Sequence, residues 1–120
     1  MVQAPTQSLT LEAFLQLPET KPASEFIAGK IVQKPMLKGK HSTLQTEFST
    51  TANVVLKPQR IARALSELRC TFAGRSLVPD VAVFVWDRIP RDLDGAIADS
   101  FPLAPAWAIE IYCQVSVKPN

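Results

Sequence analysis

Apolar and polar positions along the chain alternate between helical and strand-like spacing, and they predict a series of short elements. Residues 11–17 place their apolar side chains on one helical face, with Thr10 positioned to cap the helix and Pro18 to end it. Two apolar runs then flank Ala28-Gly29, which predicts a β-hairpin with a tight turn over residues 24–33. The N-terminal part of the chain therefore combines a helix with a hairpin.

A second helix is predicted after a basic loop. Ser42 and Gln45 have the spacing of a capping box, which would start the helix at Ser42, and Lys57-Pro58 would end it. One face of this helix carries apolar residues at helical spacing, namely Leu44, Phe48, Ala52 and Val55. We therefore expect this face to pack on a sheet.

The second half of the chain is rich in strand-forming residues. Residues 61–72 and 77–85 predict a second hairpin, connected by a turn at residues 73–76. Residues 81–85 form a continuous apolar run, which is typical of a central strand covered on both faces. Residues 107–112 predict another buried strand. The pattern as a whole indicates a chain that combines helices with strands.

Length and composition limit the class of protein. The 120 residues fit a single domain spanning 1–120, and a hydrophobic fraction of 47% with 20% charged residues is typical of a globular protein with a core. The net charge of +2 is too small to identify a nucleic-acid binder by itself. Cys70 and Cys113 are far apart in the sequence and favour two reduced thiols, with a disulfide between them as the alternative. With no apolar run long enough to cross a bilayer and no signal segment, we expect no membrane partner and a cytoplasmic location.

The predicted strands contain acidic residues at costly positions. Asp80 begins one apolar strand and Glu110 lies inside the next, and a buried carboxylate must be paired, protonated or bound to metal. If the strands are neighbours, both carboxylates can bind one Mg²⁺ (or Mn²⁺), with the carbonyl of Ile111 as a further ligand and Glu67 as a third carboxylate. Such a site would hydrolyse a phosphodiester through an activated water.

Simpler interpretations of the same residues stay open. Asp80 follows Pro79 and could only cap or turn the chain. Glu110 could point to solvent, or it could pair with an arginine such as Arg69. An acyl-transfer hydrolase is disfavoured, because the chain has no Gly-x-Ser-x-Gly elbow and its single histidine has no assigned nucleophile partner.

Four ordered segments resemble the Uma-type restriction endonuclease family, which is common in cyanobacteria and belongs to the PD-(D/E)XK nuclease superfamily. The segments are Val78-Pro79-Asp80-Val81-Ala82-Val83, Trp107-Ala108-Ile109-Glu110-Ile111, the hairpin Ser24 to Val32, and His41. The similarity covers roughly residues 9–111. It implies an α/β fold (an α+β mixed sheet) with a restriction-endonuclease-like core and flanking helices. It also implies a Mg²⁺-dependent endonuclease activity and DNA as the partner.

The resemblance also implies roles for individual residues. Asp80 and Glu110 would be metal ligands, Glu67 an auxiliary acid, and Glu25 and His41 would lie near the cleft. For Glu25 the alternative is a solvated hairpin residue, and for His41 it is a hydrogen-bonding residue at the helix start.

The C-terminal end departs from the family pattern. The superfamily places a water-orienting lysine two residues after the glutamate, where this chain has Tyr112, and Lys118 beside Pro119 is a poor replacement. We expect a C-terminally truncated domain in which metal binding is retained more readily than cleavage. Missing elements would expose the sheet and favour pairing with another chain, for example in a homodimer. The alternative function is therefore a non-catalytic remnant or interaction module.

Overall fold

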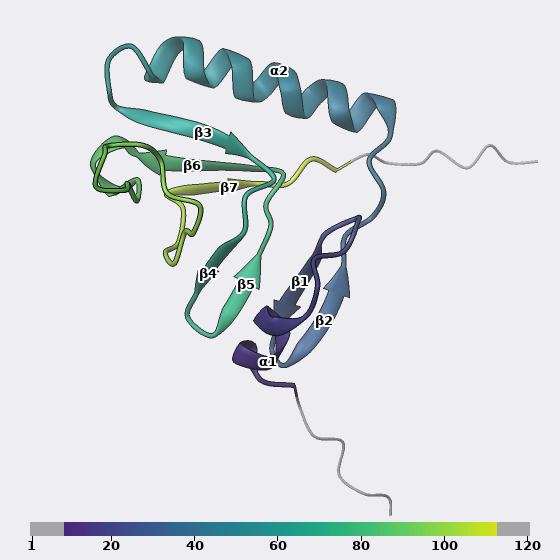
Figure 1. Cartoon of the computed structure of the whole chain (residues 1–120). Coiled ribbons are helices and arrows are strands. Elements are labelled where there is room, and N and C mark those ends of the chain that lie inside the picture. The colour runs from purple at the N-terminus through teal and green to yellow at the C-terminus, as the bar shows by residue number, and fades with distance from the viewer. Residues whose placement is uncertain (1–8, 113–120) are drawn as a thin grey trace, which may run out of the picture.

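The computed structural model describes residues 9–112 (Figure 1). The elements in chain order are α1 (Leu11–Gln16), β1 (Ser24–Ile27), β2 (Lys30–Gln33), α2 (Gly39–Leu56), β3 (Ala62–Ser66), β4 (Cys70–Phe72), β5 (Arg75–Leu77), β6 (Val81–Val85), the 3-10 helix η1 (Trp86–Arg88) and β7 (Trp107–Ile109). Neither helix in this part of the chain is long and apolar enough to span a membrane. The cytoplasmic location and the single domain over residues 1–120 stay predictions.

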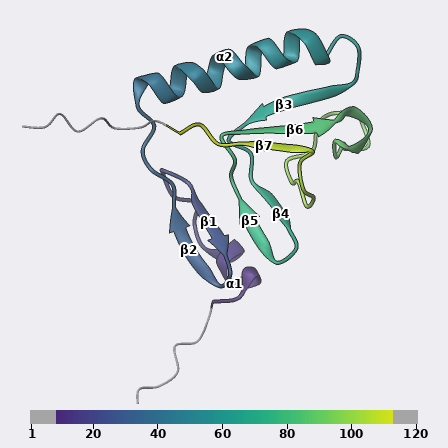
Figure 2. The same ribbon diagram turned by 180° about the vertical axis from the view of Figure 1, so that it is seen from behind.

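The strands form two sheets instead of the one mixed sheet expected. One sheet has the order β2-β1-β5-β4 and the other has the order β3-β6-β7, and the pairings between these strands are all antiparallel. Helix α2 runs along β3, while α1 lies beside the β1–β2 hairpin, as both views show (Figures 1 and 2). The α+β class is thus confirmed, and β6 is the central strand of its sheet, as its apolar run predicts.

Helix α1 forms as the sequence predicts. Thr10 caps it by accepting a hydrogen bond from the Ala13 amide at 3.1 Å. The ring of Phe14 stacks on that of Phe26 in β1 with centroids 5.3 Å apart. This contact joins the helix to the four-stranded sheet.

Two Ala-Gly turns close the two short hairpins. Ile27 pairs with Lys30 and Phe72 with Arg75, so the loops consist of Ala28-Gly29 and Ala73-Gly74. All four loop residues have positive φ, between 49° and 77°. Two consecutive residues with positive φ match the right-handed twist of the strands, and glycine adopts this conformation without steric cost.

The predicted hairpin of residues 61–85 is wrong in its details. The structure divides it into two tiers: β3 pairs with β6, whereas β4 pairs with β5 in the other sheet, and Arg75 and Ser76 belong to β5 instead of a turn. The chain bends at Glu67, whose φ is 49°. The Glu67 amide still donates to the Asp80 carbonyl at 3.2 Å, so the segments that contain Glu67 and Asp80 stay in contact.

Helix α2 begins earlier and faces another way than predicted. It begins at Gly39 after Lys38, whose side chain makes no capping bond, so the Ser42–Gln45 capping box does not form. The buried side chains of α2 are His41 and Gln45. Of the four apolar positions that define the predicted face, Ala52 packs on the sheet, whereas Leu44, Phe48 and Val55 are exposed.

A polar contact explains this orientation of α2. Strand β3 lies at the edge of its sheet, and its outward amide and carbonyl at Ala64 need partners. The side chain of Asn53 supplies both: Nδ2 donates to the Ala64 carbonyl at 3.0 Å, and Oδ1 accepts from its amide at 2.8 Å. These bonds pair both backbone groups, whose burial without a partner would be expensive, and they hold the Asn53 side of α2 against β3.

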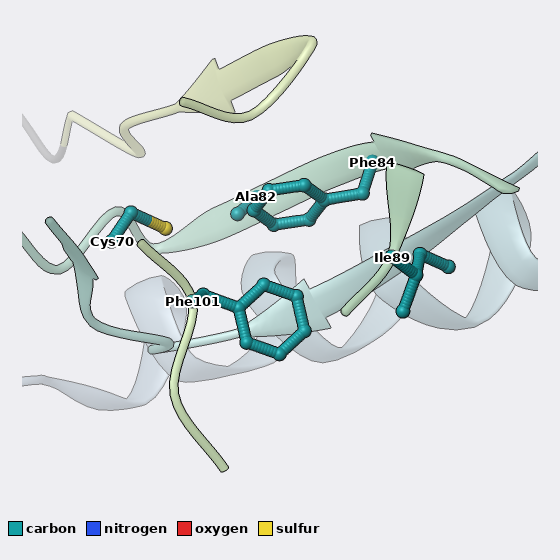
Figure 3. Packing of buried hydrophobic residues seen from close by; sticks show 5 residues of the cluster. All are labelled: Cys70, Ala82, Phe84, Ile89 and Phe101. Atoms are coloured by element: carbon teal, nitrogen blue, oxygen red, sulfur yellow. The ribbon is translucent and has the colours of Figure 1, made fainter. Parts of the chain in front are cut away.

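The central strand anchors a compact apolar cluster (Figure 3). Phe84, which is 1% exposed, meets Phe101 edge to face with centroids 4.9 Å apart, and Cys70, Ala82 and Ile89 complete the cluster. Burial raises the pKa of the Cys70 thiol to about 11. Cys70 is a free thiol, as expected; Cys113 lies outside the described residues.

The predicted buried strand of residues 107–112 is shorter and more exposed than expected. β7 ends at Ile109 and lies at the edge of the sheet, and its Trp107 side chain is 67% exposed. Glu110 therefore follows the strand instead of lying inside it. This position frees its carboxylate to turn toward the other sheet.

Candidate functional site

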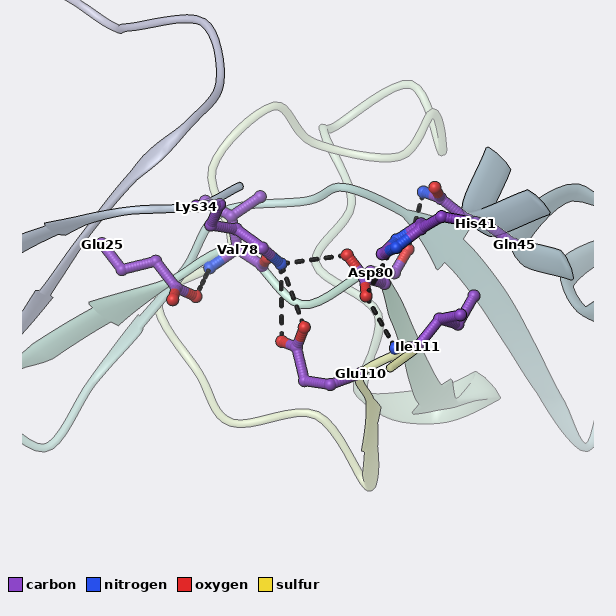
Figure 4. A network of polar contacts seen from close by, with 8 residues as sticks. All are labelled: Glu25, Lys34, His41, Gln45, Val78, Asp80, Glu110 and Ile111. Atoms are coloured by element: carbon purple, nitrogen blue, oxygen red, sulfur yellow. Dashed lines mark hydrogen bonds and ion pairs between the residues drawn. The ribbon is translucent and has the colours of Figure 1, made fainter. Parts of the chain in front are cut away.

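Asp80 is held from several directions at the junction of the two sheets (Figure 4). Its side chain is 2% exposed, directly before β6. Oδ2 accepts a hydrogen bond of 2.7 Å from the Ile111 amide, and the Asp80 carbonyl accepts one of 2.9 Å from Gln45 Nε2. The Asp80 carboxylate is thus fixed in position by residues far from it in sequence.

Lys34 joins Asp80 to Glu110. Its Nζ lies 3.1 Å from Asp80 Oδ1 and 3.1 Å from Glu110 Oε2, and it also donates to the carbonyl of Val78. Lys34 directly follows β2, and its own amide donates to the Ala23 carbonyl at 2.9 Å. Two acidic side chains from separate segments therefore share one cationic group.

These contacts shift the protonation equilibria in opposite directions. Burial alone would raise the pKa of Asp80, but hydrogen bonds from the Ile111 amide and from Lys34, together with the Lys34 charge, hold that pKa below its usual value. Burial raises the pKa of Glu110, and the Asp80 charge adds to this effect although Lys34 opposes it. The Glu110 side chain is 58% exposed, so water screens its interactions. Asp80 is the firmly ionised member of the pair.

His41 approaches the same carboxylate from helix α2. Its Nε2 lies 3.2 Å from Asp80 Oδ2 but without the geometry of a hydrogen bond, and this buried nitrogen has no other partner in the part of the chain that the structure describes. His41 therefore lies against Asp80 with its Nε2 shielded from solvent and unpaired within the described residues.

Glu25 lies next to the site but does not reach the carboxylate pair. Its Oε2 accepts a hydrogen bond of 2.8 Å from the amide of Val78, which is buried. Because Val78 leads through Pro79 to Asp80, this bond holds the segment that carries the aspartate. The solvated-residue alternative for Glu25 is therefore wrong.

The bond from Glu25 leads to a stability prediction. Glu25→Ala should lower the free energy of unfolding by about 1–3 kcal/mol, because the buried Val78 amide loses its acceptor. Glu25→Gln keeps an acceptor oxygen and should recover most of this loss. Urea denaturation of the three proteins measures the difference. Equal losses in the two variants would contradict the assigned role.

The remaining predicted residues lie at varying distances from the pair. Glu67 contributes its backbone amide to the Asp80 carbonyl, and its side chain lines a pocket beside Asp80. Ile111 contacts Asp80 through its amide, so a role for its carbonyl stays a prediction. Tyr112 is 92% exposed. Lys118 lies outside the described residues.

One alternative for Glu110 is contradicted. Arg69 binds Glu19 instead, with two nitrogen to oxygen distances of 2.8 and 2.9 Å, and it also donates to the Ser24 carbonyl. The partner of Glu110 is Lys34, which sequence reasoning missed. Its only sequence signal was a lysine directly after a predicted strand, a pattern too common to single it out.

A pocket of about 390 Å³ opens beside the carboxylate pair. Its lining comes from four regions, the loop before β1, the segment after β2, the bend after β3 and the turn into β6. It consists of Thr20, Lys21, Pro22, Ala23, Lys34, Pro35, Met36, Leu37, Glu67, Val78 and Asp80. The pocket is thus mainly apolar, with two lysines and two acids. It offers room for a substrate group next to Asp80.

The donor set fits a hard divalent cation in part. Two carboxylates already converge on one positive charge, and oxygen ligands suit Mg²⁺, which keeps several waters and needs few protein ligands. Within residues 9–112, however, no group of three or more His, Cys, Asp or Glu side chains is arranged to hold a metal. Asp80 and Glu110 could therefore hold a cation only with waters or backbone oxygens completing its coordination.

Comparisons with known proteins agree with this fold. The structure has a TM-score of 0.85 and 60% sequence identity to a protein from Anabaena variabilis ATCC 29413 described as "a putative nuclease belonging to DUF820". That match covers 88% of this chain and 59% of the Anabaena chain. The fold is therefore that of a nuclease-like α+β protein.

The family follows from the sequence match. Residues 11–114 match the Uma2 family, described as "Putative restriction endonuclease", so the chain belongs to this family. No curated protein matches it significantly. The resemblance inferred from the four sequence segments is confirmed.

Proposed function

We propose that this chain is a Mg²⁺- or Mn²⁺-dependent DNA endonuclease in which Asp80 and Glu110 are the metal ligands. The observation that carries the proposal is the convergence of these two carboxylates on one cationic group, Lys34 Nζ, at 3.1 Å from each. Membership of the Uma2 family supports a nuclease, and the adjoining pocket supports binding of a nucleotide group.

Each residue of the site has a defined part in this proposal. A bound divalent cation would supply Lewis acidity toward the phosphate and the attacking water. Asp80 stays ionised because the Ile111 amide and Lys34 stabilise its charge, so it is ready to bind the cation at neutral pH. Glu110, with its raised pKa and partial exposure, is the better placed of the two to take up a proton. His41 Nε2 lies 3.2 Å from Asp80 Oδ2, and Glu25 holds the segment that carries Asp80.

A cleavage assay tests this proposal directly. Purified protein should nick supercoiled plasmid DNA with Mg²⁺ or Mn²⁺, and EDTA should stop the reaction. The chain spans 59% of the length of its Anabaena relative, so the same assay on both proteins separates the activity of this chain from that of the longer one. Absence of nicking with both metals would remove the active-enzyme proposal for this chain.

A non-catalytic interaction module is the second candidate. It is favoured by Tyr112 at the position of the superfamily lysine and by exposed apolar side chains on α2 and β7, including Phe48 and Trp107. Exposed apolar surface of this kind is typical of protein interfaces. Sedimentation velocity tests it: a homodimer or larger assembly that neither binds Mn²⁺ nor cleaves DNA would favour the module.

A further inference from the structure

Lys34 uses its full hydrogen-bonding capacity within the site. An ammonium group has three donors, and Lys34 Nζ contacts three acceptors, the Val78 carbonyl, Asp80 and Glu110 (Figure 4). Its side chain is 13% exposed. Lys34 is therefore a largely buried lysine whose ammonium is fully hydrogen-bonded within the site.

The ammonium also occupies the place that a shared metal ion requires. A Mg²⁺ ion binds oxygens at about 2.0–2.1 Å, and Lys34 Nζ already contacts both Asp80 Oδ1 and Glu110 Oε2, the two atoms that such an ion would need, at 3.1 Å each. Two cations this close also repel each other strongly in a partly buried site. The metal and the ammonium therefore compete for the same two oxygens.

No other lysine or arginine of the described chain forms an ion pair with Asp80 or Glu110. The ion pairs that Asp80 and Glu110 make within residues 9–112 involve Lys34 and His41, and the His41 contact lacks hydrogen-bond geometry. Arg69 is occupied by Glu19. Without Lys34 the two carboxylates would face each other with their repulsion uncompensated.

We propose that Lys34 is a built-in competitor of the metal ion: its ammonium holds Asp80 and Glu110 together in the metal-free protein and must leave before a divalent cation binds both. Lys34 is thus a positioning residue that sets the metal affinity of the site. Its backbone stays anchored to the Ala23 carbonyl, so the released side chain swings into the adjoining pocket, which it lines. The inference rests on the metal site proposed above.

The decisive measurement is Mn²⁺ affinity by isothermal titration calorimetry with MnCl₂ alone. Lys34→Met keeps the length of the side chain and removes the charge, and it should tighten Mn²⁺ binding by about tenfold or more, because the displaced interactions exceed the ~1.4 kcal/mol that a factor of ten represents. Lys34→Arg keeps the competing charge and should bind no more tightly than the wild type. Unchanged or weaker binding by Lys34→Met overturns the inference.

Lys21→Met is the matched control. Lys21 lines the same pocket and its loss changes the net charge equally, but it is not an ion-pair partner of either carboxylate. We expect its Mn²⁺ affinity to stay within about twofold of the wild type. An equal gain in both variants would mean a general charge effect and would overturn the specific role of Lys34. A merely structural role of Lys34 would lower the melting temperature of Lys34→Met in EDTA without tightening metal binding.

A second experiment uses the wild-type protein, in case Lys34→Met does not fold. Acetylation of Lys34 by a water-soluble N-hydroxysuccinimide ester, followed by mass spectrometry, should become several-fold faster when Mg²⁺ is added, because the ammonium leaves its three acceptors. The exposed Lys30 in β2 should react at the same rate with and without Mg²⁺. Slower or unchanged labelling of Lys34 at saturating Mg²⁺ overturns the inference.

The outcomes separate this inference from the proposed function. If neither the wild type nor Lys34→Met binds Mn²⁺, the metal site itself fails, and the inference fails with it. If the wild type binds Mn²⁺ through Asp80 but Lys34→Met gains no affinity, only the role of Lys34 fails. If Lys34→Met alone binds Mn²⁺, the inference is supported even for a chain that does not cleave DNA.

Discussion

Replacement of Asp80 by asparagine is expected to reduce metal-dependent DNA cleavage by more than about 1000-fold, which corresponds to about 4 kcal/mol of transition-state stabilisation. Asparagine has nearly the same shape and can still accept the hydrogen bond from the Ile111 amide, but it lacks the charge that a divalent cation requires. Initial rates of plasmid nicking, together with Mn²⁺ titration, measure the effect. We expect the loss of metal binding to account for the loss of rate.

The control for this prediction is Asp99→Asn, which removes the same charge at an exposed position away from the site. Its nicking rate should remain close to that of the wild type. Circular dichroism of Asp80→Asn must show a folded protein, because breaking a buried ion pair can itself be costly. A folded Asp80→Asn protein that cleaves DNA at the wild-type rate would exclude Asp80 as a metal ligand.

Local sequence signals predicted the elements that local chemistry determines. Thr10 predicted the start of α1, and Ala28-Gly29 predicted the first hairpin turn, because capping and two-residue turns depend on a few adjacent residues. The apolar run of residues 81–85 predicted the central strand, since a strand covered on both faces shows no alternation. Asp80 stood out for a related reason, as an acid at the edge of that run.

The features that sequence reasoning missed depend on tertiary contacts. A left-handed conformation at Glu67 has no sequence signal, yet it divides the predicted hairpin between two sheets. Asn53 of α2 faces β3 and pairs with the amide and carbonyl of Ala64 at the edge of that strand. The spacing of apolar residues could not indicate this contact. Lys34 follows β2 in one sheet, and its long side chain contacts Glu110, which follows β7 in the other sheet. Its place in the site follows only from the packing of those sheets.

The same dependence on packing makes Phe84 the most sensitive position of the core. Phe84→Ala should lower the free energy of unfolding by about 3–5 kcal/mol, because it removes a ring that is 1% exposed and leaves a cavity against Phe101. Since small domains are stable by only about 5–15 kcal/mol, much of the variant would be unfolded in mild denaturant. Urea denaturation followed by circular dichroism measures the loss.

Phe48→Ala is the matched control for the core prediction, because the same ring is removed from the outer face of α2, where it is 37% exposed. Its loss of stability should be well under half of that of Phe84→Ala, since fewer contacts disappear and α2 is oriented by the bonds of Asn53 to Ala64 instead of by this side chain. Equal losses in the two variants would show that the outer face of α2 is buried in solution, as in an oligomer. Repeating the Phe48→Ala measurement over a range of protein concentrations then distinguishes an oligomer from an error in the assigned core, because only the stability of an oligomer depends on concentration.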